Sequence, residues 1–180
     1  VHRLTNMRCV HAMPFGAAVL EGGGVRFRLW APGAEAVMLR LQDDGQDLPM
    51  QRDGAGWHER VVSDARPGAR YRFVLPDGLA VPDPASRSNP DDVHGASVVV
   101  DPAAYPWRDA GWRGRPWHEA VVYELHVGTF TEAGSFAAAR ERLPDLAALG
   151  ITAVELMPVA DFPGRRGWGY DGVLPFAPDA

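Results

Sequence analysis

The pattern of apolar residues changes once along the chain, near residue 119. Of all the features of the sequence, this change most restricts the folds that the chain can adopt. Before it, short segments such as 25–30 alternate apolar and polar residues and are separated by turn-forming residues. After it come an apolar segment (121–127), a segment of helical periodicity (135–149) and a second apolar segment (151–157). The first pattern is typical of an all-β sandwich, and the second of a βαβ unit.

The first half of the chain is expected to form an immunoglobulin-like (early-set) β-sandwich over residues 13–103. No segment of useful length before residue 130 has helical periodicity. Turn-forming glycine, proline or aspartate residues bound the expected strands, which are 25–30, 37–41, 57–62, 71–75 and 97–101. Residues 104–118, which contain three tryptophans, are expected to form a connector that lies against two domains.

The second half is expected to be a parallel βαβ unit. Ser135 is a suitable N-cap for the helix, and Gly150 is suited to follow its last turn. Pro144 interrupts the helix, which predicts a kink or two short helices with Pro144 in the first turn of the second. Both faces of a parallel sheet need cover, and a (β/α)8 barrel needs about 250 residues. We therefore expect residues 119–180 to be the start of a truncated (β/α)8 TIM barrel.

Composition excludes several classes of function. The net charge is -5 and the charged residues are interspersed, which argues against a nucleic-acid partner. No apolar run approaches the ~20 residues that cross a membrane, and the N-terminus lacks a signal-peptide core. Cys9 is the single cysteine, so no internal disulfide can form. We expect a cytoplasmic protein without a membrane partner, in which residues 1–12 are a poorly ordered lead-in.

Polar side chains inside the two barrel-type strands have two interpretations. Glu124 and His126 share one face of the first strand, and Glu155 lies in the second. The two glutamates are either a catalytic acid/base pair or structural residues that form hydrogen bonds or ion pairs. The structural interpretation is favoured because catalytic groups of barrels lie at the carboxyl ends of strands. His126 is nearer that end and is a candidate for contact with substrate.

The segment 158–172 follows the second strand, on the edge where barrel active sites form. It places Trp168, Tyr170 and Asp171 close together among glycines. An aromatic ring stacks on the CH groups of a pyranose, and a carboxylate binds its hydroxyls, so this set suits a sugar site. Alternatively, Trp168 and Tyr170 only cap the barrel. About half of the six tryptophans are expected to be core residues.

Three strings of the second half resemble the α-amylase-type glycoside hydrolases (glycoside hydrolase family 13). Residues 122–130 look like their first barrel strand, 149–158 like the second, and 168–178 like the loop after it. Several subgroups carry an N-terminal sandwich. Finer strings are similar to the malto-oligosyltrehalose trehalohydrolases; they are 83–87, 89–95, 112–117 and 162–173. The resemblance covers roughly residues 14–180.

The resemblance implies an activity. It implies hydrolysis of the α-1,4-glucosidic bond next to the terminal trehalose of maltooligosyl trehalose, by a retaining mechanism with two carboxylates. In such enzymes the catalytic carboxylates come from later strands, so no catalytic residue is assigned in this chain. A malto-oligosyltrehalose synthase is implied as functional partner, and neither a metal nor another cofactor is implied.

For site residues, the resemblance implies that Tyr170 stacks on the sugar, that Asp171 binds a hydroxyl or holds the loop, and that Trp168 supports both. The sandwich resembles a carbohydrate-binding module. Three alternatives remain open: a glycogen or starch branching or debranching enzyme of the same superfamily, a non-catalytic glucan-binding module, and an unstable fragment whose open strands aggregate.

Overall fold

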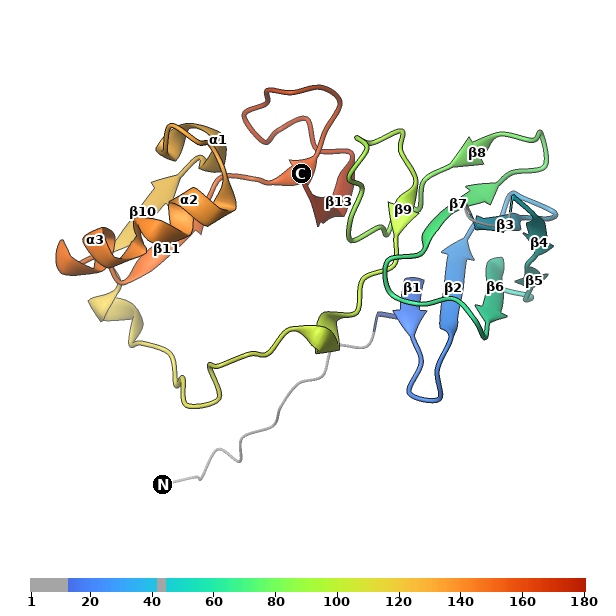
Figure 1. Cartoon of the computed structure of the whole chain (residues 1–180), viewed down its shortest axis with the longest axis horizontal. Helices are drawn as coiled ribbons and strands as arrows, with labels where there is room; N and C mark the ends of the chain where they lie inside the picture. The colour runs from blue at the N-terminus through green and yellow to red at the C-terminus, as the bar shows by residue number, and fades with distance from the viewer. Residues whose placement is uncertain (1–12, 42–44) are drawn as a thin grey trace.

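The computed structural model describes residues 13–41 and 45–180 (Figure 1). Two bodies lie at opposite ends of the molecule, one built from strands β1 to β9 and the other from β10, β11 and three short helices, with a small hairpin between them. The predictions for Cys9 and for residues 1–12 lie outside the described residues.

The N-terminal body consists of two antiparallel sheets. The order of the first is β1 (Gly16–Val19), β2 (Val25–Trp30), β6 (Trp57–Val62) and β5 (Gln51–Arg52). The order of the second is β4 (Asp47–Pro49), β3 (Met38–Leu41), β7 (Arg70–Val74) and β8 (Ala80–Val81), and β9 (Ser97–Val98) also pairs with β7. This architecture agrees with the predicted sandwich.

Alternation along the long strands builds the core of the sandwich. Val25, Phe27 and Leu29 of β2 are buried, and the residues between them reach the outer face. The ring of Phe27 meets that of Tyr71 edge to face, with centroids 4.8 Å apart. Burying one such side chain stabilises the fold by about 1.5–3 kcal/mol. Other members of the core are Val37, Leu39, Leu41, Met50, Ala65, Phe73 and Val99.

The longer predicted strands are confirmed, but β1, β4, β5 and β8 were not predicted. Strands β4, β5 and β8 have two or three residues, too few for alternation to show, and the four residues of β1 (Gly-Ala-Ala-Val) do not alternate. The predicted last strand, 97–101, is reduced to Ser97–Val98. It ends early because the Val99 amide donates to Ala69, outside the ladder, and Pro102 begins a 3-10 turn.

A loop over residues 83–97, hereafter the brace loop, is fastened to the sandwich by buried polar groups. The Tyr71 hydroxyl donates to Asp83 Oδ2 at 2.7 Å, and the Asp83 amide donates to Ser97 Oγ at 2.9 Å. Ser97 Oγ in turn donates to Asn89 Oδ1 at 3.3 Å. Burial raises the pKa of Asp83 to about 6, although hydrogen bonds from Tyr71 and Ala85 oppose the rise.

The second body is a βαβ unit. Strands β10 (Val122–Leu125) and β11 (Ala153–Leu156) are parallel and in register, as predicted. Ser135 caps α2 (Phe136–Glu141) by accepting the Ala138 amide, and α3 (Leu143–Ala148) carries Pro144 in its first turn. Gly150, at φ +97°, follows α3. The amides of Gly150 and Ile151 donate back to Ala147 and Leu146, which closes the helix with a Schellman motif.

The predicted end of the first barrel-type strand is wrong. Val127 lies in α1 (Val127–Phe130), a single helical turn that begins directly after His126. The His126 carbonyl accepts the amides of Thr129 and Phe130, so the backbone turns before the apolar alternation ends. The prediction failed because Val127 fits a strand by side-chain type, whereas this local hydrogen bonding decides the conformation.

Strands β12 (Ala160–Asp161) and β13 (Leu174–Pro178) form an antiparallel hairpin in a segment predicted as one loop. Leu174 and Ala177 of the hairpin form a buried cluster with Val93 of the brace loop. The rings of Phe15 and Phe176 lie 5.7 Å apart. The hairpin is therefore packed on the sandwich, beside the brace loop (Figure 1).

The connector 104–118 does not lie against the two bodies, which corrects the prediction. It runs between them in Figure 1, and its three tryptophans, Trp107, Trp112 and Trp117, are 68–84% exposed. None of the six tryptophans is buried in the described part of the chain, so the expected core role is also wrong. Five of the six are exposed, and Trp57 is half-buried.

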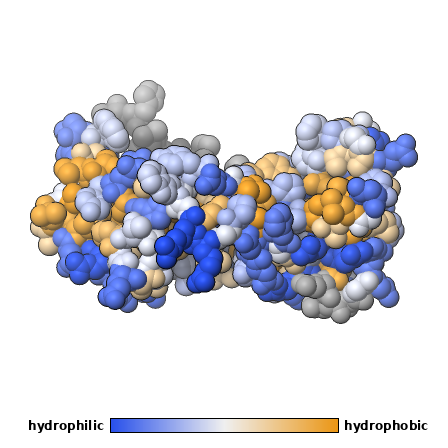
Figure 2. Space-filling view, turned by 90° about the horizontal axis from the view of Figure 1, so that it is seen from above, coloured by the Kyte–Doolittle hydropathy of each residue, from blue (hydrophilic) through white to orange (hydrophobic). Residues whose placement is uncertain are grey.

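Part of the surface of the βαβ unit is apolar. Figure 2 shows hydrophobic surface gathered on the left lobe. Val122 and Leu156, one on each strand, are 44% exposed. Across residues 13–41 and 45–180, no helix is both long and apolar enough to span a bilayer.

Candidate functional site

The exposed aromatic residues of the segment after β11 define the candidate site. The site loop, residues 162–173, joins β12 to β13. It presents Trp168 and Tyr170 with 78% and 72% of their surface exposed, and Asp171 is exposed beside them. The structure thus brings together three of the four predicted site residues on one loop.

His126, the fourth, holds the site loop by its backbone. Its Nε2 lies 2.9 Å from the carbonyl oxygen of Gly167, which is 41 residues away in the chain. Because a carbonyl only accepts hydrogen bonds, Nε2 carries the hydrogen. Nδ1 is buried and has no hydrogen-bond partner among the described residues. The carboxyl end of β10 is therefore tied to the residue that precedes Trp168.

Close backbone packing fixes the other half of the loop. Gly169 has φ +91°, and a Cβ there would lie 2.1 Å from the Pro158 carbonyl oxygen. Gly167 packs on the buried Phe162 ring, where a Cβ would come within 3.0 Å. Only glycine fits at position 169, because any side chain would collide with backbone.

The brace loop supports the site loop from the sandwich side. Asp92 Oδ2 accepts the Gly164 amide at 3.2 Å, and Asp92 itself has φ +71°. Asp161 is buried below, and its Oδ2 has no partner within the described residues. Burial, and then the charges of Asp179 and Asp92, raise the pKa of Asp161. Burial, followed by the charge of Asp92, likewise raises the pKa of Asp179.

Sequence reasoning missed these supporting residues. Asp92 and Asp161 lie in segments interpreted as plain loop, and nothing in their local pattern indicates that they meet. The run of glycines around Trp168 was the available signal, because glycine often marks a close approach of backbone to another group. No group of three histidine, cysteine or acidic residues in the described ranges is placed to hold a metal ion.

Glu124 and Glu155 are direct partners in the register of β10 and β11. Both are exposed, and neither side chain makes an ion pair or hydrogen bond within the part of the chain described here. The structural contacts that one interpretation gave them are therefore absent from this part. Two like charges on adjacent strands instead repel each other.

The outer face of the first sheet carries a second candidate site. A hollow of about 210 Å³ is lined by Arg28, Gln51, Arg52, Asp53, Trp57 and Glu59. The Arg28 guanidinium lies over the Trp57 ring, 4.4 Å from its centroid. Trp30 pairs with Trp57 across β2 and β6, is 59% exposed, and donates Nε1–H to the Ala55 carbonyl at 3.1 Å. That bond fixes the orientation of an exposed indole beside polar side chains.

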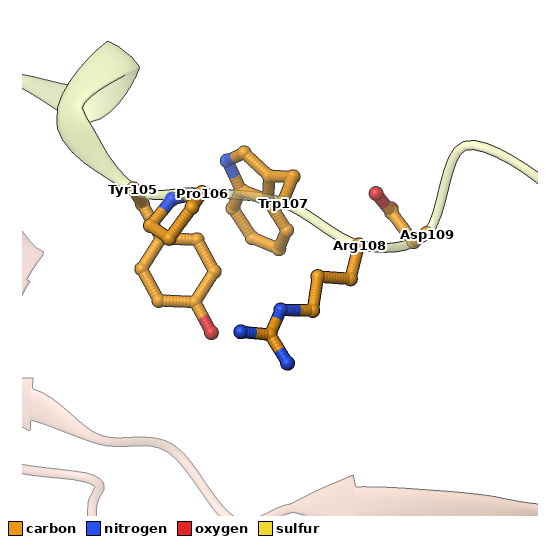
Figure 3. A pocket seen from close by; sticks show the side chains of 5 residues that line it. All are labelled: Tyr105, Pro106, Trp107, Arg108 and Asp109. Atoms are coloured by element: carbon orange, nitrogen blue, oxygen red, sulfur yellow. The ribbon is translucent and has the colours of Figure 1, made fainter.

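A larger hollow, of about 350 Å³, is formed by the consecutive residues Tyr105 to Asp109 of the connector (Figure 3). The Tyr105 and Trp107 rings meet edge to face, with centroids 4.7 Å apart and planes at 66°. Rings at this angle do not make a flat platform for a sugar chain, so the site loop and the first sheet are the stronger candidates.

Comparison with known proteins places the chain in a family. The model for carbohydrate-binding module 48, the isoamylase N-terminal domain, matches residues 14–103. The chain belongs to this family. Curated relatives extend the match beyond the module. A malto-oligosyltrehalose trehalohydrolase from Deinococcus radiodurans is 49% identical over 166 residues, which are 92% of this chain and 27% of that protein.

A 1,4-alpha-glucan branching enzyme, GlgB of Ralstonia nicotianae, is 41% identical over 87% of this chain and 24% of that enzyme. Among solved structures, a Salmonella typhimurium protein described as an alpha amylase has a TM-score of 0.90 and 54% identity, over 94% of this chain and 29% of its own. An Anoxybacillus pullulanase complexed with maltotetraose has a TM-score of 0.77 and 25% identity, over 92% and 29%. The chain spans about a quarter of the length of its curated relatives.

Proposed function

We propose that this chain is the N-terminal part of a glycoside hydrolase that releases trehalose. In this proposal, residues 13–103 are a carbohydrate-binding-module-like sandwich, 104–118 a connector, and 119–180 the first βαβ unit of a (β/α)8 barrel. The parallel register of β10 and β11 supports the barrel assignment. The observation that carries the function is the site loop, which presents Trp168 and Tyr170 just beyond the carboxyl end of β11.

The proposed reaction is cleavage of the α-1,4-glucosidic bond next to the terminal trehalose of maltooligosyl trehalose. The mechanism is retaining, with a nucleophile and an acid/base about 5–5.5 Å apart. Both carboxylates are assigned to barrel strands beyond these 180 residues. Tyr170 stacks on the sugar and Asp171 binds a hydroxyl, while Trp168 supports them. A malto-oligosyltrehalose synthase that makes the substrate, and a cytoplasmic location, belong to the same proposal.

The test uses the product of the uninterrupted reading frame that contains this chain. We expect it to release trehalose from maltooligosyl trehalose and to leave amylose unbranched. Sequencing past the codon for Ala180 should show an aspartate, a glutamate and an aspartate at later strand ends. Branching of amylose without release of trehalose would identify a branching enzyme, the activity named for the Ralstonia relative.

A variant test addresses the site loop itself. Tyr170→Ala should weaken binding of maltotetraose about tenfold, because stacking on one aromatic ring contributes roughly 1.4 kcal/mol. Tyr105→Ala, in the connector, is the matched control and should leave binding unchanged. Equal effects of the two substitutions would argue against a sugar site at the site loop.

A second candidate function is glucan binding by the sandwich alone, and the indole of Trp30 favours it. This indole is exposed, fixed by its bond to Ala55, and flanked by the polar hollow around Trp57. In affinity electrophoresis through glycogen, the chain should be retarded, and Trp30→Ala should reduce the retardation. Trp112→Ala is the control. No retardation of the unmodified chain would leave the sandwich a purely structural role.

A further inference from the structure

We propose that His126 is a positioning residue for the site loop and acts on bound sugar only through the Gly167 carbonyl. The effect on sugar binding rests on the proposed function. The effect on the loop rests on the geometry alone. His126 stands between β10 and α1, where its backbone carbonyl closes the α1 turn. The backbone of His126 is therefore held in place independently of the contacts of its side chain.

The ring of His126 is also confined. A Cβ on Gly128 would lie 3.0 Å from His126 Cε1, so the glycine leaves room for the imidazole to lie against the α1 backbone. The ring's Nε2–H then donates to Gly167 O at 2.9 Å, and Nδ1 is shielded from solvent. Neither ring nitrogen is left free and exposed to bind a sugar hydroxyl.

The hydrogen bond from His126 to Gly167 affects the orientation of Trp168 and Tyr170, which follow Gly167 in the chain. The next residue is Trp168, and Gly169 is held against Pro158 immediately after. With the His126 bond on one side and the Gly169 contact on the other, the backbone on both sides of Trp168 is fixed. Tyr170 follows directly, so the orientation of the aromatic pair depends on two contacts from outside the loop. Loss of one should leave the pair in several orientations and weaken the binding of sugar.

The test compares two substitutions in the 180-residue chain by NMR. Gln Nε2 can donate from about the position of the imidazole Nε2, whereas the shorter Asn side chain does not reach it. We expect the unmodified chain to show the Nε2–H tautomer at His126 and ordered backbone amides at 167–170. His126→Asn should lower the heteronuclear NOE of those amides and weaken maltotetraose binding about fivefold, equivalent to about 1 kcal/mol. His126→Gln should restore both.

Amide shifts of Phe27 and Phe73 in the sandwich core report on folding in the same spectra. The proposal is overturned if His126 carries its hydrogen on Nδ1, or if His126→Asn weakens sugar binding while the loop amides stay ordered. It is overturned equally if His126→Gln behaves like His126→Asn. If the unmodified chain binds no maltotetraose while His126→Asn still loosens the loop, the sugar site proposed at the site loop fails and the positioning of the loop by His126 stands.

Discussion

At the scale of single residues, a few polar groups, two of them buried and one exposed, position the site loop. Asp83 and Ser97 fix the two ends of the brace loop, and Asp92 at its tip reaches the site loop. Buried polar groups of this kind are costly unless each is paired. Asp83 is paired with Tyr71 and Ala85, and its burial makes the charged form costly all the same.

The raised pKa of Asp83 makes the stability of the sandwich depend on pH. Its pKa rises from 3.8 in the unfolded chain to about 6 in the folded one, so the folded state holds the proton more tightly. This group's contribution is greatest below the unfolded pKa and falls as pH rises towards 6. Between about pH 4.5 and about pH 6.5 the loss is about 2 kcal/mol. The substitution Asp83→Asn keeps an acceptor for the Ala85 amide and should abolish this pH-dependent loss of stability.

Urea unfolding at both pH values measures this loss as a difference between the variant and the unmodified chain. Asp64→Asn, at an exposed aspartate of the same sandwich, is the control and should leave the slope unchanged. An equal pH slope in Asp83→Asn and the unmodified chain would show that Asp83 is ionised throughout the window.

Gly169 offers a second prediction at this scale. Gly169→Ala adds a Cβ against the Pro158 carbonyl and also requires φ +91° of alanine. Gly164→Ala requires a similar φ, +100°, but opens into free space. The backbone term costs roughly 1–2 kcal/mol in both, so the excess in Gly169→Ala measures the steric clash. Thermal unfolding of the two variants gives that excess, and equal losses would mean that position 169 tolerates a side chain.

At the scale of elements, the strands and helices that could be predicted from the sequence are those with a long enough run of periodic apolar residues. The strands β2 and β6, six residues each, show alternation and are confirmed, as is the division of the helical segment at Pro144. The two-residue strands β5 and β8 exist only because neighbouring strands offer hydrogen-bond partners. A pattern confined to one segment does not contain those partners.

The candidate site likewise has one part that the sequence could predict and one part that it could not. Trp168, Tyr170 and Asp171 are adjacent in sequence, so their proximity could be predicted. The bonds from His126 and Asp92 span 41 and 72 residues. They depend on the tertiary fold, and chain spacing alone carries no information about them.

The cap of α2 is testable as an element. Ser135 Oγ accepts the Ala138 amide at 3.3 Å, and α2 has only six residues. Ser135→Ala should cost about 1 kcal/mol of stability, while Ser63→Ala, at an exposed loop serine, should cost little. Chemical denaturation followed by far-UV circular dichroism measures both. A loss of equal size in the two variants would mean that the cap contributes nothing specific to the helix.

At the scale of the whole molecule, the two bodies differ in how completely they are covered. The sandwich buries its apolar residues between two sheets. The βαβ unit has two strands whose outer edges are unpaired within the described residues, and it exposes Val122, Val154 and Leu156. Open edges with apolar side chains promote association between chains.

We therefore expect the isolated chain to associate as its concentration rises. Val154→Lys, in the middle of β11, should shift the association to higher concentration by roughly tenfold, since it places a charge in an apolar contact. Leu149→Lys, at an exposed position after α3, should have little effect. Sedimentation equilibrium measures both, and a monomer at all concentrations would show that these edges do not associate.

The brace loop has a consequence for modular protein engineering. Both of its ends are anchored inside the sandwich, through Asp83 and Ser97, while its tip, at Asp92 and Val93, contacts the site loop and the hairpin. A chimaera joined at the connector would separate two surfaces that have to match. Exchange of this sandwich for a foreign module should therefore succeed only when residues 83–97 are transplanted to fit the new recipient, even though the connector looks like the natural crossover point.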